Sequence, residues 1–258
     1  MIIAGIDVGV QNTKAVIMKD NEIIGRSEVS TGGFDRPAQA QLAYDEALRS
    51  AGVVAGDVEK VIATGKGKFD VPFADDIYTE TVAAARAAAF FHKDATAVVS
   101  VGADETLAAV IGKSRLIDEF VLNQKCTAGL GAFLSYLGQR LGFDPEQAGE
   151  CDGPDAGVMN DGCVVFSELD ALSLLSNGAT PESVMATANR AAATRAATVL
   201  NDLTASPGDS VVLIGGLTRN KAFVSAMEAR LGRKFVIPGE AVFCGAVGAA
   251  LSHTEGTV

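Results

Sequence analysis

Short apolar runs alternate with amphipathic stretches along most of the chain. Residues 6–18 and 99–111 each carry apolar positions interrupted by a glycine turn, and each leads into a further run at 22–30 or 115–122. This pattern predicts three successive strands in each place. Other strands are predicted at residues 58–64, 210–214 and 235–237. Helices are predicted after Cys126 and at residues 36–52, 79–91, 168–177, 181–203, 220–231 and 242–252. Strands that alternate with helices indicate an α/β fold with helices covering a mixed sheet.

The two predicted strand–turn–strand segments are similar to each other. The segment that starts at Ile6 can be laid without gaps on the one that starts at Val99, an offset of 93 positions (99 − 6). The identical pairs are Val8 and Val101, Gly9 and Gly102, Thr13 and Thr106, and Ala15 and Ala108. A gapless match that crosses two turns predicts a duplicated domain. Residues 144–160, rich in Gly, Pro and Asp, are expected to form a long loop instead.

Composition narrows the class of protein. The chain has 258 residues, of which 48% are hydrophobic, so it can bury a substantial core. A net charge of −11 argues against nucleic acid or an anionic membrane as a general partner. No apolar run approaches the roughly 20 residues that a membrane-spanning helix needs, and the N-terminus lacks the pattern of a signal peptide. We therefore expect a cytoplasmic protein.

Two of the four cysteines stand near predicted helix starts. Cys126 precedes a glycine turn that opens an amphipathic helix, and Cys163 lies a few residues ahead of the helix at 168–177. Helix N-termini favour a thiolate or an anionic cluster. A [4Fe–4S] cluster needs four thiolates, which a two-fold dimer would supply if each subunit gave two. The spacing alone favours the alternative, in which both cysteines are small buried hydrophobic residues.

Glycine turns after two predicted strands suggest a site for phosphate. The segment from Asp7 to Lys14 places an acid at a strand end, then Gly9, a hydroxyl at Thr13 and the lysine. The turn N–H groups and Lys14 suit phosphate oxygens, and Asp7 suits Mg²⁺ held through water. Taken alone, the segment is more simply a tight β-hairpin. Gly215 and Gly216, at the end of another strand, add a place where an α/β sheet would take a nucleotide.

These segments together resemble the actin–Hsp70–sugar kinase superfamily of ATPases. With the cysteines included, the chain looks like the ATP-dependent activators of 2-hydroxyacyl-CoA dehydratases and the ATP-binding subunits of benzoyl-CoA reductase. The specific part of the match is Asn123-Gln-Lys-Cys126-Thr-Ala-Gly129-Leu-Gly131-Ala-Phe-Leu134 and Cys163-Val-Val-Phe-Ser-Glu168. More general motifs extend it over nearly the full length: Gly5-Ile-Asp7-Val-Gly9, Ala63-Thr-Gly65-Lys-Gly67, Gly215-Gly216-Leu-Thr-Arg-Asn220 and Gly245-Ala-Val-Gly248.

The resemblance implies an α/β fold of two duplicated ribonuclease-H-like domains with a nucleotide cleft between them. It places the domains at residues 1–95 and 96–240, with a C-terminal helix of about 241–258 packing back on the first. It implies ATP or ADP with Mg²⁺ as ligand, Asp7 and Thr13 as catalytic residues, and Glu80 and Glu168 at family positions without a defined role. The implied nucleotide-binding residues are Gly9, Gln11, Thr13, Lys14, Gly102, Asp104, Gly215, Gly216 and Asn220.

The same resemblance makes Cys126 and Cys163 ligands of one [4Fe–4S] cluster shared across a dimer, and leaves Cys151 and Cys244 as structural thiols. The implied partners are a second copy or a homologous subunit, an electron donor such as ferredoxin, and an iron–sulfur acyl-CoA dehydratase or reductase. The implied function is an ATPase that delivers low-potential electrons to that enzyme.

One segment departs from the family pattern. Its second phosphate segment usually reads Asp-Ile-Gly-Gly-Gln-Asp-Ser/Thr-Lys, whereas this chain has Ser100 in place of the acid and Leu107 in place of the lysine. We expect weaker Mg²⁺ binding or hydrolysis as a result. Two alternatives therefore stay open beside the electron activator: a weakly catalytic subunit of a heterodimer, and a sugar or acyl kinase of the same superfamily. A kinase would leave the cysteine segments unexplained.

Overall fold

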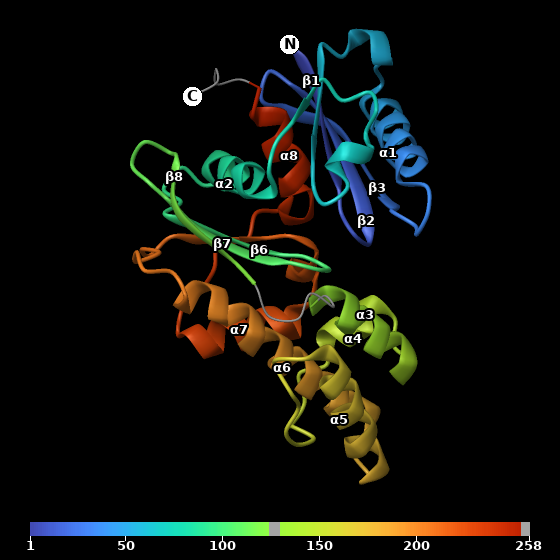
Figure 1. The fold of residues 1–258 in the computed structure, drawn as a ribbon, viewed down its shortest axis with the longest axis vertical. Coiled ribbons are helices and arrows are strands. Elements are labelled where there is room, and N and C mark those ends of the chain that lie inside the picture. The colour runs from blue at the N-terminus through green and yellow to red at the C-terminus, as the bar shows by residue number, and fades with distance from the viewer. Residues whose placement is uncertain (124–129, 254–258) are drawn as a thin grey trace.

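The structure is a computed structural model that describes residues 1–123 and 130–253. Two mixed sheets lie one above the other, with helices between and around them (Figure 1). The first sheet has the strand order β3-β2-β1-β4-β5 and the second has the order β8-β7-β6-β9. The strands are β1 (Ile2–Val8), β2 (Asn12–Lys19), β3 (Glu22–Ser30), β4 (Lys60–Thr64), β5 (Asp76–Ile77), β6 (Ala97–Val101), β7 (Thr106–Ile111), β8 (Ile117–Leu122) and β9 (Val211–Ile214).

The duplication predicted from the sequence is present in the strand pairing. In the first sheet Asp7 pairs with Lys14 and Val8 with Thr13. In the second sheet the pairs are Ser100 with Leu107 and Val101 with Thr106, each shifted by the same 93 positions. Each sheet then adds a parallel strand beside its first one, β4 in one case and β9 in the other. The α/β class and the repeated strand order are thereby confirmed.

Helix α1 (Arg36–Ala51) covers the outer face of the first sheet. It begins where the Asp35 carboxylate accepts the N–H of Ala38, and it ends at Gly52, whose φ of 69° is left-handed. Its buried face includes Tyr44 and Leu48, which share a core cluster with residues of β1 and β2. The spacing of these apolar residues explains why the segment folds as a helix here.

Two alanine-rich helices, α2 (Glu80–Phe91) and α8 (Cys244–Leu251), join the two sheets (Figure 1). Alanines of α2 share a core cluster with β6, β7 and β9, while α8 shares one with β1 and β2. A Cβ on Gly248 would overlap the carbonyl of Ala83, so the two helices are in direct backbone contact. Helix α2 thus follows the last strand of the first sheet but packs on the second sheet, whereas α8 follows the second sheet and packs on the first. The boundaries at residues 95 and 240 stay a proposal.

The remaining helices lie beyond the second sheet: α3 (Leu130–Leu141), α4 (Pro145–Glu150), α5 (Val164–Ser176), α6 (Pro181–Asn201) and α7 (Lys221–Leu231). Short 3₁₀ turns complete the chain at η1 (Ala55–Asp57), η2 (Lys68–Asp70), η3 (Gly216–Arg219) and η4 (Ala241–Phe243). Helix α6 is the most buried of the group and packs against α3, α5 and α7. Within the described ranges, no helix combines the length and apolar character that crossing a bilayer requires.

Three local predictions differ from the structure. The expected loop at 144–160 contains α4, which begins at a capping box between Asp144 and Gln147 and has Pro145 in its first turn. The helix expected at 168–177 begins earlier, at Val164, with Cys163 as its N-terminal cap residue. The strand expected at 235–237 forms only an isolated bridge between Val236 and Val212.

Candidate functional site

A cavity lies where the β1–β2 and β6–β7 hairpins face each other across the molecule. It is walled also by the loops after β4 and β9 and by the start of α2. The predicted site residues that line it are Asp7, Gly9, Gln11, Lys14, Gly102, Asp104, Gly215 and Gly216. Segments far apart in the sequence are thus brought together at one place. This arrangement suits a ligand held from both sides.

Both hairpins turn in the same way. The N–H of Gly9 donates to the carbonyl of Asn12 at 3.2 Å, and the N–H of Gly102 donates to that of Glu105 at 3.0 Å. A Cβ at Gly9 would lie 2.7 Å from the Asn12 oxygen, so glycine is needed for the turn to close. Residues of both turns line the cavity, the position that an anion-binding turn requires.

The Asp7 carboxylate is set deep in the cavity wall, between two glycines. A Cβ on Gly65 would lie 2.5 Å from Oδ1 of Asp7, and a Cβ on Gly245 would overlap Oδ2. Burial raises the pKa of Asp7, Lys14 opposes that effect, and the negative charge of Glu80 adds to it. A buried carboxylate that opens on a cavity suits a cation held through water. The acid's burial means that binding a cation there would also relieve an unfavourable charge.

Thr13 does not line the cavity, contrary to its predicted contact with phosphate. Its side chain is fully buried, and its hydroxyl lies 3.0 Å from that of Thr31. The Thr31 hydroxyl donates its single proton to the carbonyl of Gly9 at 2.9 Å, so Thr13 must be the donor to Thr31. This chain of hydrogen bonds fixes the first turn from behind. Thr13 is a positioning residue in this arrangement.

Asn220 also has a different setting from the one predicted. Its Oδ1 accepts the N–H of Phe223 at 2.8 Å, which caps α7, and its Nδ2 donates to Oδ1 of Asn189 at 2.9 Å. It lies beside a neighbouring hollow rather than in the main cavity wall. Its side chain is engaged in holding α7 and α6 together. The adjacent Gly215 and Gly216 do line the cavity.

The loops after the two parallel strands are a further matched pair. Gly65 follows β4 with φ of 90°, and Gly215 follows β9 with φ of 101°. A Cβ on Gly65 would lie 2.6 Å from the carbonyl oxygen of Val8, and one on Gly215 would overlap that of Val101. Both positions therefore need glycine for its backbone freedom and for close approach. The duplication extends into these loops, which the sequence comparison did not reach.

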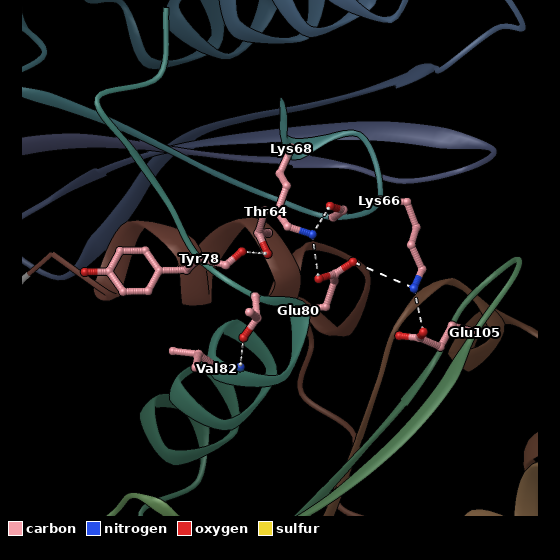
Figure 2. Close-up of polar contacts among 9 residues, drawn as sticks. Thr64, Lys66, Lys68, Tyr78, Glu80, Val82 and Glu105 are labelled. Atoms are coloured by element: carbon pink, nitrogen blue, oxygen red, sulfur yellow. Dashed lines mark hydrogen bonds and ion pairs between the residues drawn. The ribbon is translucent and has the colours of Figure 1, made fainter. Parts of the chain in front are cut away.

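Lys66, which sequence reasoning did not single out, is a charged residue in the cavity wall. Figure 2 shows Lys66 and Lys68 directed toward Glu80, with Glu105 meeting Lys66 from the other hairpin. The Lys66 Nζ lies 2.5 Å from Oε2 of Glu105 and 3.9 Å from Oε1 of Glu80. Lys68 donates to Glu80 and to the carbonyl of Gly65, each at 3.2 Å. Lys66 belongs to the Ala63–Gly67 motif, but no signal in the sequence places it opposite Glu105.

The start of α3 contacts the second turn directly. The N–H of Ala132 donates to the carbonyl of Ala103 at 3.0 Å. A Cβ on Gly131 would lie 2.8 Å from the carbonyl oxygen of Gly102. The second turn is therefore in direct backbone contact with α3, the helix that follows the Cys126 segment.

The predicted metal ligands are only partly described. Cys126 lies outside the described residues. Cys163 is half-buried, and its N–H donates to Oδ1 of Asn160 at 2.7 Å. Cys244 is fully buried and Cys151 is half-buried, and burial raises the pKa of both thiols. In the part of the chain that the structure describes, no three potential ligands among His, Cys, Asp and Glu gather in one place.

An apolar face on α5 lies next to Cys163. Val165, Phe166, Leu169 and Leu172 are each more than half exposed, at 61%, 58%, 55% and 56%. Helix α5 projects at the end of the molecule opposite the N-terminus (Figure 1). Scattered apolar residues are normal on a protein surface, but a group along one helix is typical of an interaction site.

Two sheets of one topology that face each other across such a cavity define the actin-like ATPase and sugar kinase fold. A ROK family glucokinase from Streptomyces griseus, solved with glucose and AMPPNP, shares it with a TM-score of 0.63 at 16% identity. That alignment covers 98% of this chain and 99% of the glucokinase. The predicted fold class is confirmed.

Sequence comparison assigns the chain to one family within this fold. Residues 4–252 match the BadF/BadG/BcrA/BcrD ATPase family, and the chain belongs to it. An activator of lactoyl-CoA dehydratase from Anaerotignum propionicum is 30% identical over 257 residues, covering 99% of this chain and 98% of that protein. The activator of 2-hydroxyisocaproyl-CoA dehydratase from Clostridium difficile, solved with bound ADPNP, has a TM-score of 0.89 at 25% identity. That alignment covers 98% of this chain and 94% of the activator. The resemblance stated from the sequence is confirmed.

Proposed function

We propose that this ATPase delivers low-potential electrons from a [4Fe–4S] cluster to an acyl-CoA dehydratase or a benzoyl-CoA reductase. Cys126 and Cys163 from each of two subunits hold the cluster, and ATP with Mg²⁺ binds in the cleft between the hairpins. A ferredoxin-like protein supplies the electrons, and the site of action is the cytoplasm. The observation that carries the proposal is Cys163 at the start of α5, beside an exposed apolar helix face.

The donor chemistry fits the cluster. Cys163 is the N-terminal cap residue of α5, so it lies at the positive end of the helix dipole, where an anionic cluster is favoured. When bound, the cluster supplies one-electron chemistry at a potential set by its solvation and hydrogen bonds. The apolar face of α5 suits a contact with a second subunit, which would bring the second pair of thiolates.

The contact between the second turn and α3 supports coupling of the cleft to the cysteines. Gly102 and Ala103 line the cavity, and Gly131 and Ala132 touch them from the first turn of α3. Phosphate groups that draw the two hairpins together would move this turn, and α3 would carry the movement toward the Cys126 segment. Hydrolysis would reverse the movement. The nucleotide would in this way control how the cluster is exposed to its redox partner.

The test is an anaerobic preparation assayed for iron, sulfide and visible absorbance. We expect about four irons and four sulfides per two chains in the wild type. Both contents should fall to background in Cys126→Ser and Cys163→Ser. They should be retained in Cys151→Ser, because the Cys151 thiol is half-buried and donates a hydrogen bond to the carbonyl of Gln147 in α4. Iron-free wild-type protein that still binds ATP would contradict the proposal and favour the alternative, a sugar or acyl kinase.

A weakly catalytic subunit of a heterodimer is the second candidate. The observation that favours it is the neutral pair Ser100 and Leu107, which occupies the register of Asp7 and Lys14 in the second sheet. ATP turnover by the isolated chain separates the two candidates. A homodimer that hydrolyses ATP supports the electron activator by itself, whereas cluster loading and turnover only with a co-expressed homologous subunit supports the second candidate.

A further inference from the structure

Lys66 joins the two halves of the molecule across the cleft. It follows β4 in the first half, whereas its partner Glu105 lies in the β6–β7 turn of the second half. The Nζ–Oε2 distance is 2.5 Å, and both residues line the cavity (Figure 2). The position that corresponds to Lys66 in the second half is Gly216, which follows Gly215 as Lys66 follows Gly65. This cation therefore has no counterpart in the duplicated loop.

The charges of the cavity wall make this lysine important. Among the residues described as lining it, the cations are Lys14 and Lys66, and both come from the first half. The second hairpin contributes no cation to that wall, because Leu107 stands where the first hairpin has Lys14. Its turn instead carries two acids, Asp104 and Glu105. A polyphosphate would meet repulsion on that side unless a cation intervened.

The ion pair is suited to exchange. The Lys66 side chain is 41% exposed, and pairs at such exposure contribute little to stability. Glu80 does not depend on Lys66, since Lys68 already donates to it at 3.2 Å. Burial lowers the pKa of Lys66, but the hydrogen bond and the charge of Glu105, with Glu80 and Asp104, outweigh burial and raise it. The ammonium is therefore charged at neutral pH, and a phosphate with several anionic oxygens can compete for it.

On the basis of the nucleotide binding proposed above, we propose that Lys66 is the phosphate-binding cation for the second half of the cleft. In the nucleotide-free protein its ammonium is paired with Glu105. When a nucleotide enters, Lys66 exchanges this carboxylate for oxygens of the phosphate chain. Glu105 thus acts as an internal competitor of the nucleotide, and the two substitutions at this pair should have opposite effects on affinity.

The test is calorimetric titration of the full-length protein with MgADP and with Mg–ADPNP. Lys66→Gln should weaken binding about tenfold, the loss expected for one charge-assisted contact to phosphate. Glu105→Gln should tighten binding by roughly two- to fivefold, because an exposed ion pair no longer competes. The double variant should bind between Lys66→Gln and the wild type, since without the lysine Glu105 no longer competes for a cation but still repels the phosphate chain.

The matched control is another lysine–glutamate pair, Lys221 and Glu150, which lies on the surface at 2.9 Å. Lys221→Gln and Glu150→Gln should leave both affinities unchanged. If Lys66→Gln and Glu105→Gln weakened binding equally, the pair would be a structural link across the cleft and the inference would be wrong. It would be wrong too if neither changed affinity. Wild-type protein that bound neither nucleotide would overturn the proposed function itself, and this inference with it.

Discussion

The β1–β2 and β6–β7 hairpins share their backbone structure but differ in the side chains that they present to the cavity. Their strands pair in the same register, and their glycine turns make the same hydrogen bond. The first carries Asp7 and Lys14 where the second carries Ser100 and Leu107. Strand pairing and turn geometry limit only the apolar and glycine positions, so the cavity-facing residues were free to diverge. The comparison indicates that the strands of the first hairpin supply the acid and the lysine of the site. The second hairpin supplies a neutral wall of the cavity at those positions and a contact to α3.

The buried threonines show the same divergence. The Thr13 hydroxyl is part of a chain of hydrogen bonds to Thr31 and Gly9. Thr106 holds the equivalent position and is equally buried, but its hydroxyl has no hydrogen-bond partner among the described residues. An identical residue therefore supports the turn in one hairpin and not in the other.

The largest expected effect is on ATP hydrolysis. Asp7→Asn should lower turnover by about 100-fold, the scale expected for removing a charge that stabilises the reacting phosphate and its cation. Ser100→Ala, at the matched position, should change turnover less than about threefold, because a neutral hydroxyl contributes little. Steady-state phosphate release measures both. Equal losses in the two variants would show that the hairpins share the chemistry.

The next largest effect concerns Leu107, which stands in the second hairpin where the first has Lys14. Leu107 is only 2% exposed, so Leu107→Lys should reduce the free energy of unfolding by about 2–3 kcal/mol through an unpaired, poorly hydrated charge. Adding Ser100→Asp should restore at least about 1 kcal/mol, because the two residues pair directly across the strands. Urea unfolding gives the values. If Leu107→Lys alone left the free energy of unfolding unchanged, the second hairpin would tolerate the lysine without an acid at position 100.

The threonines offer a smaller, sharper comparison. Thr13→Val should cost about 1 kcal/mol of stability, since it removes the donor to Thr31. Thr106→Val should be neutral within about 0.5 kcal/mol or stabilising, because it replaces a hydroxyl that has no described partner. Urea unfolding of both variants checks this. A larger loss in Thr106→Val than in Thr13→Val would reverse the assignment.

The smallest effect is a pH dependence of stability. Burial raises the pKa of Asp7 above its ordinary value of 3.8. The folded state therefore binds more protons than the unfolded state between the two pKa values, and wild-type stability falls as pH rises through that window. Asp7→Asn lacks this loss, so at neutral pH and without cations its Tm should be higher than that of the wild type. The difference should shrink toward pH 4 in melting curves; a constant difference would contradict it.

Local patterns in the sequence were enough for much of this fold. The gapless match at an offset of 93 residues predicted that both hairpins have the same strand register, because side-chain alternation and turn glycines are set locally. The start of α5 could not be predicted from apolar periodicity, because its first turn includes Val165 and Phe166, which belong to an exposed apolar surface. Helix α4 was missed because its capping signal lies within a stretch rich in Gly and Pro.

Site residues that come from a single segment could be predicted from the sequence. Those whose position depends on a residue from a second segment could not. Asp7, Gly9 and Lys14 come from one hairpin and line the cavity as expected. The setting of Thr13 depends on Thr31, which follows directly after β3, and that of Lys66 depends on Glu105, 39 positions later. Such pairings are properties of the tertiary structure, and a single sequence gives no indication of them.

The most direct test of the link between cleft and cluster is the electron paramagnetic resonance spectrum of the reduced protein under anaerobic conditions. The spectrum of the wild type should change when MgADP is replaced by MgATP, since the nucleotide alters the surroundings of the cluster. In Asp7→Asn the two spectra should be the same. A cluster signal that is identical with both nucleotides in the wild type, or no cluster signal at all, would contradict the proposed coupling.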